Sequence, residues 1–193
     1  MTGQTDSADG GHLVIDLAAI VANWRDLDRR SRPGRAAAVV KADAYGLGAE
    51  RVVPALADAG CESFFVAFAD EGAAIRPLVP HGRVFVLEGV HDGSLEAMHQ
   101  AKLVPVLASI EQVALWADHG DDRPCALQVD TGMNRLGLSV DEAMRLAGDQ
   151  ALRARLNIVH VLSHFACADE PGHRLNRRQS ESFQGVVTAF AEI

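Results

Sequence analysis

Aromatic residues, paired cysteines and long apolar runs are all scarce in this 193-residue sequence. Aromatic residues make up only 5% of the chain, which argues against an all-β sandwich, because such sheets rely on aromatic and β-branched side chains. The three cysteines, Cys61, Cys125 and Cys167, lie far apart and form no CxxC pair. This spacing argues against a disulfide framework and against a zinc site built from cysteines. No stretch approaches the ~18 apolar residues that cross a bilayer, so we expect no membrane partner.

Concentrated positive charge is also lacking. The formal net charge is -8, and the one basic run is RLNRRQ at 174–179. Binding to nucleic acid needs clustered lysine and arginine, so we expect no nucleic-acid partner. Residues 1–11 are polar and no apolar signal segment follows them, which predicts a flexible tail on a cytoplasmic protein.

Helical and extended periodicities alternate along the rest of the chain. Apolar runs typical of buried strands cover residues 36–42, 63–69, 83–88, 103–107, 125–130 and 156–165. Helical spacing occupies the intervals at 16–27, 52–57, 94–101, 109–117, 139–147 and 179–190. Helix boundaries are marked by Asp16 as a cap, by Gly60 as a stop, and by capping boxes at Ser109 with Gln112 and Ser139 with Glu142.

The polar residues that follow these strands predict a barrel. Lys41, Asp70, Glu88, Asp130 and the pair Ser163 and His164 stand at successive strand ends, which converge on one mouth in a (β/α)8 barrel of the TIM type. The first turn, KADAYGLG, is neither GxGxxG nor a P-loop, which disfavours an open doubly wound sheet. We expect residues 12–193 to form an incomplete barrel of about six βα units, truncated before its last two strands.

Three residues at this mouth are candidates for chemistry. The apolar run before Lys41 buries its stem, and a lysine desolvated beside positive charge becomes a nucleophile that forms Schiff bases. In DTGMNRLGL (130–138), two glycines position Arg135, whose guanidinium matches a carboxylate. His164 follows the last strand. The alternatives are a solvated lysine, a surface arginine in a tight turn and a structural histidine.

A metal site is disfavoured. His160 and His164 are four residues apart, a spacing that suits ligands on a helix, but on a strand it only places both side chains on one face. His173 lies in a loop without a partner pattern. We expect no metal.

Four motifs carry a resemblance to a known family. AVVKADAYGLG, FVAFADEGAAIR, QVDTGMNRLGL and SHFACADEP together resemble alanine racemases, the fold-type III pyridoxal-phosphate enzymes, from about His12 to the end. The resemblance implies that Lys41 holds pyridoxal 5'-phosphate covalently and is the base on the D-alanine side. It also implies that Tyr45 hydrogen-bonds the cofactor phosphate, that Arg135 lies near the cofactor's phenolic oxygen and the substrate carboxylate, and that His164 packs beside the pyridine ring.

The resemblance further implies an amino-acid racemase, an isomerase that interconverts L-alanine and D-alanine and supplies D-alanine for peptidoglycan. The family protein is a homodimer in which a tyrosine from the partner's C-terminal β-domain is the second base. Tyr45 is the one tyrosine of this chain. We therefore expect a truncated N-terminal portion, without the β-domain, that has weak or no activity alone.

One position departs from the family, and several readings stay open. Gln128 stands where many members have a lysine that buttresses the arginine; an amide is able to orient Arg135 by a hydrogen bond, so this variation leaves the chemistry possible, and whether Gln128 replaces the lysine stays open. The alternative function is a single-barrel pyridoxal-phosphate carrier without racemase activity. A non-functional fragment and a preference for serine over alanine also remain open.

Overall fold

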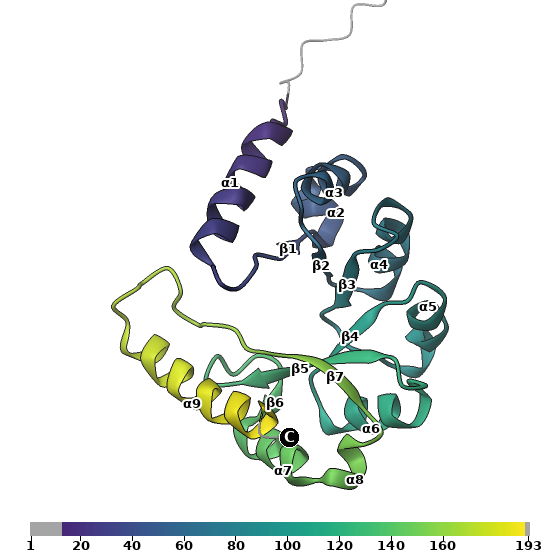
Figure 1. The fold of residues 1–193 in the computed structure, drawn as a ribbon, viewed down its shortest axis with the longest axis vertical. Helices are drawn as coiled ribbons and strands as arrows, with labels where there is room; N and C mark the ends of the chain where they lie inside the picture. Colours follow the sequence, from purple (N-terminus) through teal and green to yellow (C-terminus); the bar gives the residue numbers. More distant parts are fainter. Residues whose placement is uncertain (1–12, 192–193) are drawn as a thin grey trace, which may run out of the picture.

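The computed structural model describes residues 13–191 and shows a curved sheet with helices along its outer side (Figure 1). The predicted tail, residues 1–11, lies outside the described residues. The strands are β1 (Ala38–Val39), β2 (Ser63–Val66), β3 (Arg83–Val86), β4 (Val104–Leu107), β5 (Pro124–Asp130), β6 (Leu138–Ser139) and β7 (Asn157–Leu162). The helices are α1 (Leu17–Arg30), α2 (Lys41–Gly46), α3 (Ala49–Asp58), α4 (Ala69–Ile75), α5 (Leu95–Gln100), α6 (Ile110–His119), α7 (Val140–Gly148), α8 (Gln150–Arg153) and α9 (Arg174–Ala191), with 3-10 turns η1 (Arg76–Leu78) and η2 (Asp92–Ser94).

Every strand pair in this sheet is parallel. The order is β1-β2-β3-β4-β5, and β5 also pairs with both β6 and β7. Each of β1 to β4 leads through helical structure to the next strand, and β5 leads through a loop to the short β6, after which α7 and α8 lead to β7. This is the βα repeat that the sequence predicted, with β6 added. The fold is therefore α/β with the architecture of a partial (β/α)8 barrel.

Alternating side chains divide the core into two parts. Phe64, Val84 and Leu127 point outward, and each is fully buried against the helices. Their neighbours in sequence point to the inner face, where Phe85, Val106 and others form a second, smaller cluster. The ring of Phe85 stacks on Phe65, with centroids 4.6 Å apart, and on His160 at 5.2 Å. These rings fill the interior of the partial barrel, and the site lies above them.

Several predicted element boundaries are wrong because the strands are shorter than the apolar runs. The run 36–42 contains a strand of two residues, since the chain turns after Val40. In the run 63–69 the strand ends at Val66. Asp70 therefore lies exposed in the first turn of α4 rather than at a strand end. Strand β7 ends three residues before Phe165, and β6 was not predicted because two residues leave no periodic signal.

The predicted helix boundaries fare better. Asp16 accepts a hydrogen bond from the N–H of Ala19 at 3.0 Å, and Ser139 with Glu142 forms a complete capping box. Gly60, with φ of +104°, follows the end of α3. The last helix begins at Arg174 rather than residue 179, so the basic run is helical. No helix within residues 13–191 is long and apolar enough to cross a membrane.

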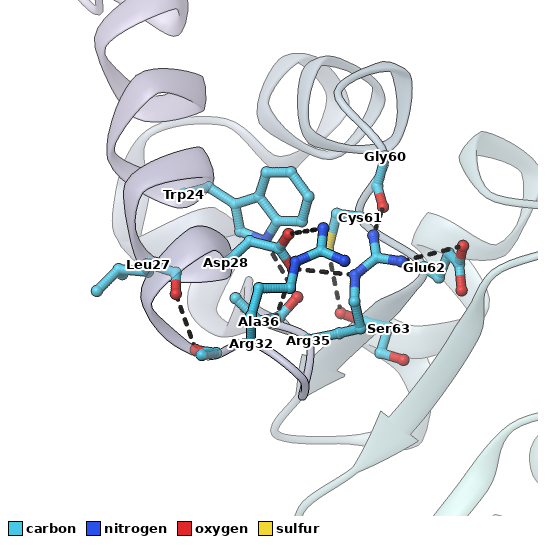
Figure 2. Close-up of polar contacts among 11 residues, drawn as sticks. Trp24, Leu27, Asp28, Arg32, Arg35, Ala36, Gly60, Cys61, Glu62 and Ser63 are labelled. Atoms are coloured by element: carbon cyan, nitrogen blue, oxygen red, sulfur yellow. Dashed lines mark hydrogen bonds and ion pairs between the residues drawn. The ribbon is translucent and has the colours of Figure 1, made fainter.

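A buried carboxylate fastens α1 to the segment that enters β1 (Figure 2). Asp28 accepts hydrogen bonds from the backbone N–H of Ala36 (3.0 Å), from Arg35 Nε (3.0 Å) and from Arg32 Nη2 (2.8 Å). The indole of Trp24 donates to the Ala36 carbonyl oxygen at 3.2 Å. The hydrogen bond from Ala36 outweighs burial and, with Arg35 and Arg32, lowers the pKa of Asp28 below its usual value of 3.8.

Asp28→Asn is expected to destabilise the protein in a pH-dependent way. Because the pKa is lower in the folded than in the unfolded state, the charged carboxylate stabilises the fold above the unfolded pKa, and this contribution is lost as the pH falls toward the folded pKa. Urea midpoints should therefore differ most between wild type and variant near pH ~7 and should converge below about pH 4.

Asp26→Asn is the matched control, since Asp26 lies on the same helix but forms only surface ion pairs with Arg29 and Arg30. Equal effects of the two substitutions at every pH would contradict a structural role for the Asp28 cluster.

Candidate active site

The carboxyl ends of the parallel strands surround one open cavity of about 590 Å³. All four residues singled out from the sequence line it: Lys41, Tyr45, Arg135 and His164. Of the other strand-end residues, Glu88, Asp130 and Ser163 also line the cavity, whereas Asp70 does not. The sequence therefore located the mouth of the barrel, although it misplaced Asp70.

A left-handed turn brings Lys41 and Tyr45 to the same cavity. The four residues from Ala42 to Tyr45 have φ angles between +51° and +56°, in the left-handed helical region. For L-residues this conformation costs about 1–2 kcal/mol each, so surrounding contacts must hold it. The side chain of Asp43 accepts a hydrogen bond from the N–H of Ala49 at 2.6 Å, which closes the turn against α3.

The start of this turn is held from the neighbouring βα unit. Glu71, in the first turn of α4, accepts a hydrogen bond from the N–H of Ala42 at 2.7 Å through Oε1. Its Oε2 accepts from Ala67 at 2.6 Å and from Phe68 at 3.2 Å. The residue after Lys41 is thus tied to the carboxyl end of β2.

The loop that carries Arg135 is folded around one carboxylate oxygen. Oδ1 of Asp130 accepts from the N–H groups of Gly132 (2.8 Å), Met133 (2.9 Å) and Asn134 (3.1 Å). The chain then returns beside β5, and a Cβ at Gly137 would lie 2.7 Å from the backbone nitrogen of Asp130. Only glycine fits this close approach, and its φ of +131° also favours glycine.

A buried glutamine fixes the segment that carries His164. Gln179 on α9 is 1% exposed; its Nε2 donates to the carbonyl oxygen of His164 at 2.8 Å, and its Oε1 accepts from Ala166 at 2.9 Å. Nε2 also reaches the hydroxyl of Thr131 at 3.2 Å, which in turn lies 2.8 Å from Ser163 Oγ. The end of β7 is thereby joined to the end of β5.

A second amide joins the ends of β3 and β4. Oε1 of Gln112 accepts from the N–H of Ala108 at 2.8 Å, and its Nε2 donates to the Glu88 carbonyl oxygen at 2.8 Å. The capping box predicted for Ser109 and Gln112 is only half present. The Ser109 hydroxyl accepts a hydrogen bond from the N–H of Gln112, but the Gln112 side chain does not bond to the N–H of Ser109. A Cβ at Gly89 would lie 2.2 Å from Gln112 Oε1 and would displace this amide, and the φ of +82° at Gly89 also favours glycine.

The polar groups at the mouth are available to a ligand. Within residues 13–191, no hydrogen bond or ion pair engages the Lys41 amine, the Tyr45 hydroxyl, the Arg135 guanidinium or the His164 ring. Lys41 is half-buried, whereas the Tyr45 side chain is 63% exposed. The amine of Lys41, the phenol of Tyr45, the guanidinium of Arg135 and the imidazole of His164 thus face one cavity above an apolar floor.

Gln128 forms no hydrogen bond with Arg135 among the described residues. Its side chain is 9% exposed and lines the cavity. The arginine is instead positioned by the backbone of the loop around Asp130.

The described residues hold no clustered metal ligands, and two of the three free cysteines are buried. Across residues 13–191, no group of three histidine, cysteine, aspartate or glutamate side chains is arranged to hold a metal ion. Cys61 and Cys125 are buried, and burial raises the pKa of the Cys125 thiol to about 12. This thiol is protonated at neutral pH and is no nucleophile.

Sequence reasoning missed the residues that support the site. Glu71 and Gln179 do not line the cavity themselves, yet Glu71 holds the backbone of Ala42 beside Lys41, and Gln179 holds the backbone of His164. Glu71 is the third residue of α4, a position where a carboxylate often caps a helix. That pattern predicts the cap but not the bond to Ala42, which depends on how two βα units pack.

Lys41 and Arg135 thus lie at the mouth of a partial βα barrel, the face on which enzymes with this fold carry their active sites. The sequence model of the alanine racemase N-terminal domain matches residues 15–193, and the chain belongs to this family. Alanine racemase from Rhizobium meliloti is 51% identical over 182 residues, which cover 92% of this chain and 48% of the relative. Alanine racemase from Brucella abortus is 48% identical over 195 residues, which cover 98% of this chain and 49% of the relative.

Solved structures agree. Alanine racemase from Bartonella henselae, described with covalently bound pyridoxal phosphate, superposes with a TM-score of 0.84 at 35% identity over 91% of this chain and 50% of that one. Alanine racemase from Streptomyces lavendulae superposes with a TM-score of 0.81 at 30% identity, over 92% of this chain and 48% of that one. The chain spans about half the length of these relatives.

Asp130→Ala is expected to loosen the loop that carries Arg135. Since all three N–H groups bond to Oδ1, Asp130→Asn keeps an oxygen that accepts them and should preserve the loop. Limited trypsin digestion measures the difference as cleavage after Arg135, which should be faster in the alanine variant and near wild type in the asparagine variant. Equal cleavage of all three proteins would contradict the anchoring role.

Proposed function

We propose that the cavity binds pyridoxal 5'-phosphate covalently through Lys41, and that the protein containing this chain is an alanine racemase. The observation that carries the proposal is the convergence of four unengaged groups, those of Lys41, Tyr45, Arg135 and His164, on one cavity. Family membership and the names of the relatives favour the racemase over a cofactor carrier.

The residues present fit such a cofactor. An opening of about 590 Å³ is in the range of small-molecule sites, and its apolar floor suits a flat ring. In the proposed arrangement the Tyr45 hydroxyl donates a hydrogen bond to the phosphate, and the His164 imidazole packs beside the pyridine ring. The Lys41 amine supplies the covalent link.

The bound cofactor would supply an electron sink, which stabilises the negative charge left when an amino acid loses its α-proton. The Arg135 guanidinium is placed to bind the substrate carboxylate, since its planar fork matches two carboxylate oxygens. The Lys41 amine would move a proton at the α-carbon from its own side of the substrate.

Inversion of the α-carbon needs a second acid or base on the opposite side. Tyr45 is the one tyrosine of the chain and is assigned to the phosphate, so we propose that the second group comes from outside this sequence. A homodimer in which a partner domain covers the mouth would supply it. In this proposal the product D-alanine serves peptidoglycan synthesis in the cytoplasm.

Reductive trapping tests the covalent link. The chain contains two lysines, Lys41 and Lys102, so each molecule carries its own reference. After incubation with pyridoxal phosphate and reduction with borohydride, peptide mapping should find at least ~10-fold more label on Lys41 than on Lys102, because only Lys41 lines a cavity that suits the cofactor.

Lys41→Arg is expected to abolish the specific label, whereas Lys102→Arg should leave it unchanged. Equal labelling of the two lysines in a folded chain would overturn the proposed cofactor site.

A further inference from the structure

We propose that Glu71 is a positioning residue that holds the left-handed turn beside Lys41 and thereby sets how readily Lys41 forms its covalent bond with pyridoxal phosphate. The second part of this inference depends on the proposed function, whereas the first part concerns the chain alone. No ion pair joins Glu71 to Lys41 among the described residues, so the effect passes through the backbone.

The hydrogen bond of Glu71 lies directly beside Lys41. The N–H of Ala42 is the backbone donor next to Lys41, and Ala42 is also the first residue of the left-handed turn. Glu71 binds this N–H at 2.7 Å, at the point where the chain leaves the ordinary region of backbone conformation. Because left-handed geometry is unfavourable for alanine, loss of this contact removes a restraint on the residues that direct both Lys41 and Tyr45.

The carboxylate of Glu71 matches the hydrogen-bonding groups that surround it. The three groups that Glu71 binds, on Ala42, Ala67 and Phe68, are all N–H donors, and they divide between its two oxygens. A carboxylate accepts at both oxygens, whereas a glutamine amide would point an NH2 group at a donor. At Gln112 the partners are one N–H and one carbonyl oxygen, and there the chain has an amide.

Glu71→Gln is therefore the informative variant, since it keeps the shape of the side chain and removes one acceptor. Glu142→Gln is the matched control: Glu142 is also the third residue of its helix and binds the N–H and hydroxyl of Ser139, but it contacts nothing near Lys41. Circular dichroism and urea midpoints establish that each variant is folded.

Hydrogen exchange in the cofactor-free chain is the first readout. Amides of residues 42–47 should exchange roughly ten-fold faster in Glu71→Gln, the size expected when a hydrogen bond to a charged group is lost. The same amides should be unchanged in Glu142→Gln. Unchanged exchange in Glu71→Gln, equal acceleration in the control, or global unfolding of Glu71→Gln would each overturn the proposal.

The rate of covalent trapping of pyridoxal phosphate on Lys41 is the second readout. It should fall in Glu71→Gln and stay at the wild-type value in Glu142→Gln. If the wild-type chain gives no Lys41 adduct, the proposed cofactor site fails, while the exchange result still decides whether Glu71 holds the turn. If wild type and Glu71→Gln trap at equal rates, the role of Glu71 in reactivity is wrong and the cofactor site stands.

Discussion

A carboxylate that accepts a backbone N–H holds each end of the short segment that carries Lys41. Asp28 binds the N–H of Ala36 before β1, and Glu71 binds the N–H of Ala42 after it. Between them, β1 pairs only two residues with β2, which is too little ladder to fix a strand by itself. The chain can then turn sharply into four left-handed residues, because both of its ends are tied to neighbouring elements.

The rest of the mouth depends on the same kind of lateral bond. Gln112 joins the ends of β3 and β4, and Gln179 joins those of β5 and β7. In each case the side chain offers the donors and acceptors that the neighbouring loops leave unsatisfied. Such bonds fix loops of a sheet whose inner apolar cluster is small, and they leave the heads of Lys41 and Arg135 free to meet a ligand.

The repeat of strands and helices and the residues of the site were accessible from the sequence, whereas their support was not. Lys41, Arg135 and His164 follow apolar runs, and parallel strands bring their carboxyl ends to one edge. The strand predicted over 36–42 was too long, because hydrophobicity does not reveal that the backbone turns left-handed from Ala42. Asp70 was wrongly predicted to stand at a strand end for a related reason. Glu71 caps α4, and the strand ends at Val66, three residues before the end of the apolar run.

Contacts between distant units could not be predicted. The bond from Glu71 to Ala42 spans 29 residues and that from Gln179 to Thr131 spans 48. Each depends on the packing of complete βα units, for which a single sequence carries no local signal. The absence of a hydrogen bond between Gln128 and Arg135 is a similar case, since residue type alone shows only that such a bond is possible.

In the proposed function, three separate loops form one cofactor site around Lys41. Hydrogen exchange of the chain with and without pyridoxal phosphate tests it most directly. The account predicts slower exchange on binding in residues 41–48, 130–137 and 163–166 together, with little change at the opposite ends of the strands. Slower exchange that is confined to other segments would contradict the shared site. So would unchanged exchange in all three loops when Lys41 carries the label.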